Sequence, residues 1–184
     1  MKVGTDGVLL GAWAPAGIRI LDVGTGSGLI ARMLMQRCPE AEVEGIDIDE
    51  AAAEQARENG VKAYCAKLQE WQGTYDLIVS NPPYFQNSLK NPNKGRQTAR
   101  HTDTLSYAEL IHHSARLLNE NGQLALILPA EAENEVRQLA AAENLFLTRV
   151  TRVYSKESKP ARRVLLAFRK CTMDNGQLSK TLSS

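Results

Sequence analysis

The sequence of 184 residues lacks the features that mark several classes of protein. No apolar run approaches the length of a membrane span, and the first residues do not have the basic-then-apolar layout of a signal peptide. Cysteines and histidines are few: Cys38, Cys65 and Cys171 form no Cys-x-x-Cys pair, and His112 and His113 are neighbours that cannot share a helix face. We therefore expect a soluble cytoplasmic protein with reduced thiols, without a bound metal and without a membrane partner.

Acidic residues are missing from one long stretch, although the net charge is only +1. Residues 77–102 contain four bases and no acid, and residues 149–163 contain six bases against one acid. Residues 40–58 have the opposite bias, with eight acids and one base. A polyanion could lie against the two basic stretches and would be repelled by the acidic one. The alternative is that both basic stretches are simply solvated loops.

The chain also lacks repeats, low-complexity tracts and an interdomain linker, and short apolar runs alternate with helical stretches. This alternation predicts one α/β domain over residues 1–184, with a mostly parallel Rossmann-like sheet and helices on both faces. Two last strands, joined by a loop over 155–161, predict an antiparallel hairpin at the sheet edge, followed by a frayed tail over 171–184. The predicted strands are Arg19–Val23, Glu42–Asp47, Lys62–Ala66, Tyr75–Ser80, Gly122–Leu128, Leu145–Tyr154 and Arg163–Arg169, which makes a seven-stranded sheet. The predicted helices are Gly28–Cys38, Ala51–Asn59, Tyr107–Leu118 and Glu131–Glu143, with Asn59-Gly60 and Asn121-Gly122 as stops or turns.

A glycine-rich loop follows the first strand but lacks the third glycine of a dinucleotide fingerprint. Its glycines are Gly24, Gly26 and Gly28, and Leu29 stands where Gly-x-Gly-x-x-Gly requires glycine. Asp22 precedes the loop, and Asp47 ends the second strand at the place where a carboxylate binds a ribose diol. This spacing favours S-adenosylmethionine (SAM) over a nicotinamide cofactor.

The tetrapeptide Asn81-Pro82-Pro83-Tyr84 follows the fourth strand and is the most informative motif. The prolines favour extended backbone, so the Asn81 side-chain oxygen and the Pro82 carbonyl can together accept both hydrogens of an amino group. The Tyr84 ring suits stacking on a flat base. Taken alone, the tetrapeptide could also be an ordinary proline-rich turn.

These motifs resemble those of class I SAM-dependent methyltransferases that methylate amino groups. Three further segments, Met1–Trp13, Ala99–Leu105 and Arg163–Phe168, are similar to the tRNA1(Val) adenine-N6 methyltransferase family, and the similarity runs from Met1 to about Phe168. The resemblance implies methylation of the N6 amine of the adenine next to the anticodon of a valine tRNA. One departure is Lys67, which stands where the family commonly has an acid near the cofactor adenine.

The candidate site follows from the motifs and the resemblance together. We expect Asn81, Pro82, Pro83 and Tyr84 to carry the transfer, with Phe85 beside the target base and Arg96, Arg100 and Arg163 as phosphate contacts or solvated bases. The expected cofactor residues are Thr5, Asp6, Asp22, Gly24, Thr25, Gly26, Gly28, Asp47, Ile48, Leu68 and Asn81.

Several alternatives remain open at this point. Residues 1–13 could form a lid over the methionine end of the cofactor, or Thr5-Asp6-Gly7 could simply cap a helix that starts near Val8. Trp13 and Trp71 are interpreted as packing residues. The rival functions are methylation of rRNA guanine or of a protein glutamine, a SAM- or RNA-binding module without turnover, and a nicotinamide reductase. We expect a monomer.

Overall fold

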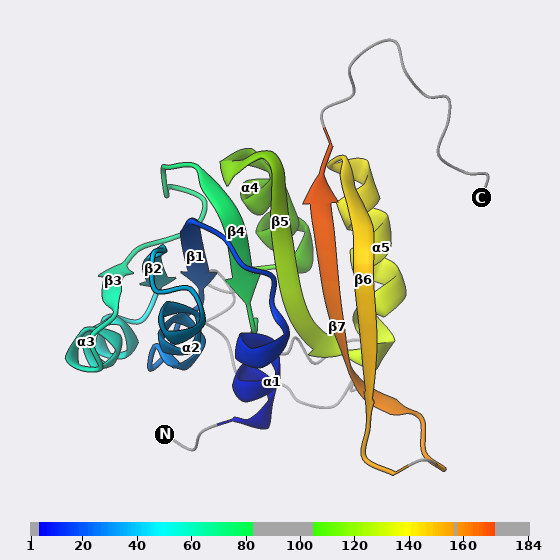
Figure 1. The fold of residues 1–184 in the computed structure, drawn as a ribbon. Coiled ribbons are helices and arrows are strands. Elements are labelled where there is room, and N and C mark those ends of the chain that lie inside the picture. The colour runs from blue at the N-terminus through cyan, green and yellow to red at the C-terminus, as the bar shows by residue number, and fades with distance from the viewer. Residues whose placement is uncertain (1–3, 83–104, 157, 172–184) are drawn as a thin grey trace, which may run out of the picture.

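Seven strands form a single sheet with the order β3-β2-β1-β4-β5-β7-β6 (Figure 1). The computed structural model describes residues 4–82, 105–156 and 158–171. The first five strands in this order are mutually parallel, and β7 runs antiparallel to both of its neighbours. The strands are β1 (Arg19–Val23), β2 (Glu42–Asp47), β3 (Lys62–Cys65), β4 (Tyr75–Ser80), β5 (Leu118–Pro129), β6 (Leu145–Tyr154) and β7 (Ala161–Lys170).

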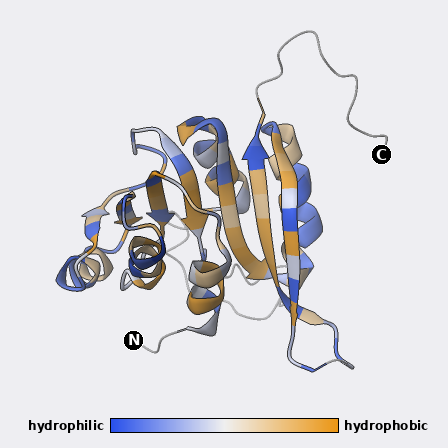
Figure 2. Cartoon of the chain, in the orientation of Figure 1, coloured by the Kyte–Doolittle hydropathy of each residue, from blue (hydrophilic) through white to orange (hydrophobic). Residues whose placement is uncertain are grey.

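Helices cover both faces of the sheet because alternate strand residues are apolar on opposite sides. Leu77 and Val79 pack in one core cluster, while Ile78 between them packs in the other. The first cluster lies under α1 (Thr5–Trp13), α2 (Leu29–Arg37) and α3 (Glu50–Glu58), and the second under α4 (Tyr107–Leu117) and α5 (Glu133–Ala142). In Figure 2 the long strands β5 and β7 are coloured as hydrophobic along most of their length, as expected for strands buried on both faces. No helix in the described part of the chain is long and apolar enough to cross a membrane.

The local signals explain where most helices begin. The Asp49 side chain accepts a bond from the Ala51 amide at 3.0 Å and caps α3. Ser106 and Glu109 form a capping box at the start of α4. At α1, however, the predicted cap is wrong: the helix already begins at Thr5, after an N-cap Gly4 that offers no side-chain bond.

The predicted fold is confirmed, with differences at the element ends. Most elements shift by one or two residues, as at β3, which ends at Cys65. The prediction of a turn at Asn121-Gly122 is wrong, because β5 starts four residues earlier, at Leu118, and continues through this pair. Asn121 has φ +62°, and β5 has three more residues than β4 between the pairs Tyr75–Leu118 and Leu77–Gln123, so the strand is irregular at this point. The antiparallel hairpin is also confirmed, and its second strand, β7, is the inner one.

Candidate active site

The predicted motifs meet at one edge of the sheet. Val23 pairs with Ser80 on one side and with Ile46 on the other, so Gly24, Asn81 and Asp47 leave three neighbouring strands side by side. Parallel strands lie about 4.8 Å apart. The Ser80 hydroxyl donates to the Val23 carbonyl at 2.8 Å and ties the end of β4 to the start of the glycine loop. This role of Ser80 could not be predicted, since a buried serine in a strand has no distinctive sequence pattern.

The glycine loop needs its glycines for two different reasons. Gly24, Gly26 and Gly28 have φ values of +69°, +55° and +81°, in the left-handed region that other residues rarely adopt. A Cβ at Gly24 or Gly26 would meet nothing within 4 Å, whereas one at Gly28 would lie 2.8 Å from the Val61 side chain. Gly24 and Gly26 therefore keep an open backbone surface, and Gly28 allows the start of α2 to pack closely against Val61 and Ala56.

Asp22 lies under the loop and is fully buried. One of its oxygens accepts bonds from the Thr25 hydroxyl at 2.8 Å and from the Ala31 amide at 3.2 Å. Its other oxygen, Oδ1, is buried without a hydrogen-bond partner among the described residues. Burial raises the pKa of this carboxyl to about 7. The Thr25 side chain is turned toward Asp22 and is only 6% exposed, so Thr25 can offer a ligand its backbone but not its hydroxyl.

Asp47 organises the loop from the neighbouring strand. One carboxylate oxygen accepts the Gly26 amide at 2.9 Å, and the other accepts the Asp49 amide at 3.0 Å. Each oxygen keeps further acceptor capacity. Binding of a ribose diol by Asp47 stays a prediction, and the structure adds that the same side chain fixes the loop.

The two apolar residues expected near the cofactor adenine differ in accessibility. Ile48 is 53% exposed directly after β2, so its side chain can pack against a flat ring. Leu68 is only 3% exposed and belongs to the core, which argues against a direct contact. Lys67 is exposed beside them, after the end of β3.

Asn81 and Pro82 lie just beyond the last paired residue of β4, which is Ser80. The side-chain oxygen of Asn81 is buried and has no hydrogen-bond partner among the described residues. A buried acceptor without a partner is costly, so a ligand that donates there would relieve the cost. Three residues that the sequence assigned to catalysis or to the base, Pro83, Tyr84 and Phe85, lie outside the described residues. The same holds for two predicted phosphate contacts, Arg96 and Arg100.

The first turn of α1 reaches this edge on the same face of the sheet as α2. A Cβ at Gly7 would lie 3.1 Å from the Leu29 side chain, which places the start of α1 against the start of α2. Thr5 is exposed, and Asp6 accepts a bond from Arg163 Nε at 2.8 Å. The interpretation of Arg163 as a solvated base is therefore wrong, because its guanidinium pairs with a carboxylate.

Both tryptophans pack as predicted. Trp13 packs against the core cluster under α1, and its indole N–H donates to Thr151 at 3.0 Å. Trp71 packs against the other cluster and donates to the Tyr75 hydroxyl at 2.8 Å.

The edge fits SAM by the chemistry of its unpaired groups. The open loop at Gly24 and Gly26 exposes backbone, the carboxylate of Asp47 keeps acceptor capacity for the hydroxyl groups of such a ligand, and the buried Asp22 lies beneath the loop. The described residues contain no cluster of three or more His, Cys, Asp or Glu side chains that could hold a metal ion.

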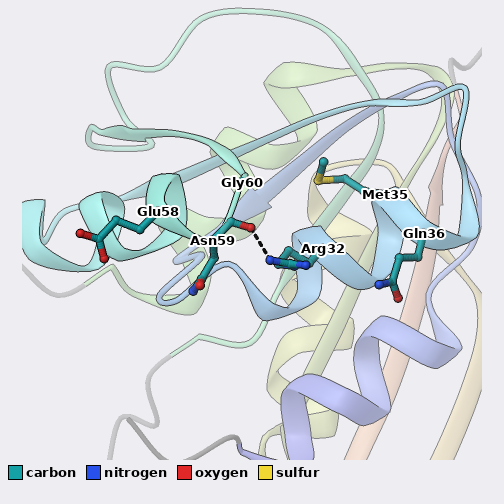
Figure 3. Close-up of a pocket in the computed structure, with 6 residues that line it drawn as sticks. All are labelled: Arg32, Met35, Gln36, Glu58, Asn59 and Gly60. Atoms are coloured by element: carbon teal, nitrogen blue, oxygen red, sulfur yellow. Dashed lines mark hydrogen bonds between the residues drawn. The ribbon is translucent and has the colours of Figure 1, made fainter.

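A shallow pocket of about 460 Å³ lies elsewhere, between α2 and the end of α3 (Figure 3). Its lining includes Arg32, whose guanidinium bonds the Asn59 carbonyl at 2.5 Å. None of the sequence-predicted site residues lines it. We therefore place the site at the sheet edge.

The fold and this edge define a class I SAM-dependent methyltransferase. A methyltransferase from Pyrococcus furiosus is 20% identical, with a TM-score of 0.66, over 90% of this chain and 81% of that one. A TehB-like SAM-dependent methyltransferase from Corynebacterium glutamicum is 19% identical, with a TM-score of 0.63, over 92% of this chain and 89% of that one. At these identities, the two structures support the fold alone.

Sequence comparison gives the family. The sequence model of the methyltransferase small domain matches residues 5–151. A tRNA1(Val) (adenine(37)-N6)-methyltransferase from Bacteroides fragilis is 44% identical over 91% of this chain and 77% of its own length. Relatives of the same name from Parabacteroides distasonis and Klebsiella pneumoniae are 47% and 42% identical, over 90% and 91% of this chain and 76% and 75% of theirs. The chain belongs to the family that these relatives define.

Proposed function

We propose that this protein methylates the N6 amine of an adenine in tRNA, with SAM as the methyl donor. The adenine is the one at position 37 of a valine tRNA, as named in the relatives. The observation that carries the proposal is the buried, unpaired side-chain oxygen of Asn81 at the end of β4, beside the glycine loop. Such an acceptor suits a donor that arrives with the substrate, as an exocyclic NH₂ does.

The chain's own residues would act mainly by orientation. When bound, SAM supplies a methyl group on a positively charged sulfur, which is a good leaving group. The Asn81 oxygen and the Pro82 carbonyl would accept the two amine hydrogens, favour a pyramidal nitrogen and stabilise the positive charge that grows on it. No strong base is needed, because the methylated ammonium loses its extra proton readily to water.

The open loop and the acidic residues of the edge would hold the donor. Gly24 and Gly26 would let the backbone approach it, Asp47 would bind the ribose, and Asp22 would support the loop from below. Thr5 and Asp6, at the start of α1, would close over the methionine end. Tyr84 and Phe85 would stack on and enclose the base, which in an anticodon loop is already accessible. A monomeric state and a cytoplasmic location stay predictions.

The test is nucleoside analysis of tRNA after incubation with the protein and SAM carrying a labelled methyl group. We expect label in N6-methyladenine from valine tRNA, and about 10²-fold less or lower still after Asn81→Ala. Parallel incubations with rRNA and with a protein extract separate the two rival acceptors, guanine and glutamine. Label in either of them, with unlabelled tRNA, would refute the proposed substrate, and SAM binding without label in any fraction would refute turnover.

A further inference from the structure

The six bases of residues 149–163 fall into two groups of three. The first group is held within the fold, and Arg149 is an example. Its guanidinium lies 4.4 Å from the centre of the Trp13 ring and donates to the Trp13 carbonyl at 3.1 Å. Arg152 bonds both carboxylate oxygens of Glu133, at 2.9 and 2.7 Å. Arg163 bonds Asp6, so these three bases already have structural partners.

The second group is Lys156, Lys159 and Arg162, at the turn between β6 and β7. All three are exposed, and their side chains form no ion pair or hydrogen bond with any other described residue. Tyr154, at the base of the turn, is 54% exposed. Three unpaired cations and an aromatic ring therefore share one short segment, which we call the hairpin tip (residues 154–162), and its sequence contains a single acid, Glu157.

The hairpin tip projects beyond the edge of the sheet that carries the site. The last residue of β5, Pro129, pairs with Arg163, and the last pair of the hairpin is Tyr154 with Ala161. In Figure 1 the turn between β6 and β7 extends past the ends of the other labelled strands. β4 and β7 are separated only by β5, so they lie two strand spacings, about 10 Å, apart across the sheet. Ser80 is level with Leu126 and Leu166, so the Tyr154–Ala161 pair lies four residues, about 13 Å, beyond the level of Asn81 along the strands.

We propose that the hairpin tip is an RNA-binding arm that holds phosphates of the substrate tRNA a few nucleotides away from the target adenine. The proposal rests on the proposed function and replaces Arg163 by Lys156, Lys159 and Arg162 as the phosphate contacts on this hairpin. Unpaired, flexible cations suit a polyanion, since binding releases the counterions of the RNA. Exposed aromatic rings beside cations are typical of surfaces that bind single strands, because a base can stack on the ring.

The test compares the wild type with the variant Lys156→Ala/Lys159→Ala/Arg162→Ala over a series of salt concentrations. We expect the KM for unmodified valine tRNA to rise about tenfold at moderate salt, since three phosphate contacts are lost. The slope of log KM against log salt should fall by roughly 2 to 3, about one per contact. The affinity for SAM should not change, and the loss should appear in KM rather than in kcat.

Arg169→Ala is the matched control for Arg162→Ala. Both arginines are exposed on β7, but Arg169 lies at the opposite end of the strand, away from the site. We expect Arg162→Ala to raise the KM for tRNA and to lower the salt slope, and Arg169→Ala to do neither. If both substitutions changed the KM for tRNA and the salt slope equally, the effect would come from a general loss of positive charge, and the proposed RNA-binding arm would be refuted.

Measuring tRNA binding directly, by fluorescence anisotropy, separates this proposal from the proposed function. If the wild type methylates tRNA while the triple variant keeps its KM and salt slope, the arm is refuted and the function stands. If the wild type binds tRNA through the hairpin tip but forms no N6-methyladenine, the function is refuted and the arm stands.

Discussion

The two halves of the site edge are built from contacts of very different range along the chain. In the half formed by β1 and β2, Thr25 bonds Asp22 three residues away, and Gly26 bonds Asp47 21 residues away. In the half formed by α1, β6 and β7, Asp6 bonds Arg163 across 157 residues, and Trp13 bonds Thr151 across 138. The first half is a local motif, whereas the second is assembled only by the complete fold.

The two halves also differ in charge. The acids of residues 40–58 surround β2 and α3, and the bases of residues 149–163 lie on the β6–β7 hairpin. RNA would be repelled from the first half and attracted to the second. The difference separates the tasks: the first half suits a small cofactor, and the second suits a polyanionic substrate.

The largest expected effect tests the boundary between the halves, at Asn81. We expect Asn81→Ala to reduce methyl transfer about 10²-fold or more, the scale of losing one oriented polar group, while SAM affinity stays within a few-fold. Single-turnover rates and calorimetry measure the two quantities. Asn119→Ala is the control, because this amide bonds Asp76 at 3.0 Å, away from the site edge. Equal losses of rate and affinity would mean that Asn81 only shapes the cofactor site.

The second prediction concerns the cofactor half alone. Asp47→Ala removes an acceptor for the ribose and releases the Gly26 amide, so SAM affinity should fall about 10- to 100-fold, as expected for losing hydrogen bonds to a charged group. Asp49→Ala removes a neighbouring carboxylate that caps α3 and should leave the affinity nearly unchanged. Calorimetry decides, and unchanged affinity in Asp47→Ala would remove this residue from the site.

The third prediction uses the buried carboxyl under the loop. Burial raises the pKa of Asp22 from 3.8 to about 7, so between these pH values the folded protein holds a proton that the unfolded chain releases. The contribution of Asp22 to the free energy of unfolding should therefore fall as the pH rises from about 4 to about 7, by at most about 1.4 kcal/mol per pH unit.

Urea unfolding of the wild type and Asp22→Asn across this pH range isolates that contribution. The difference in the free energy of unfolding between the two proteins should shrink toward pH 4 and grow toward pH 7. The free energy of Asp22→Asn should depend less on pH than that of the wild type. Asp49→Asn, which removes an exposed carboxylate, should follow the wild type. Parallel curves for the wild type and Asp22→Asn would show that Asp22 titrates alike in both states.

The fold could be predicted from the sequence largely because its signals are local. Glycines at Gly24, Gly26 and Gly28 and a capping carboxylate at Asp49 mark element boundaries within a few residues. The irregular stretch of β5 at Asn121 was missed because an Asn-Gly pair is typical of turns, whereas in the structure the strand continues through this pair.

The sequence indicated residues that meet at the site edge, among them Asp47 and Asn81, but it could not show which bases of the hairpin the fold leaves unpaired. It named Arg163 as a phosphate contact, whereas our proposal names Lys156, Lys159 and Arg162. A row of bases does not reveal which of them the fold pairs with acids. Arg163 pairs with Asp6, and Arg152 pairs with Glu133. Both acids lie outside the hairpin in the sequence.

The smallest expected effect tests the long-range half through the Asp6–Arg163 pair. Both side chains are mostly buried, at 20% and 25% exposure, so a double-mutant cycle with Asp6→Asn and Arg163→Gln should give a coupling of about 1 kcal/mol in the free energy of unfolding. The matched cycle with Asp6→Asn and Arg162→Gln should give a coupling of about zero, because the Arg162 side chain forms no hydrogen bond or ion pair with Asp6. In methylation assays the order should reverse, with Arg162→Gln raising the KM for tRNA more than Arg163→Gln does. If Arg163→Gln raised the KM more than Arg162→Gln did and showed no coupling to Asp6, Arg163 would again be the expected phosphate contact. The distinction between bases that stabilise the fold and bases that bind the RNA would then be wrong.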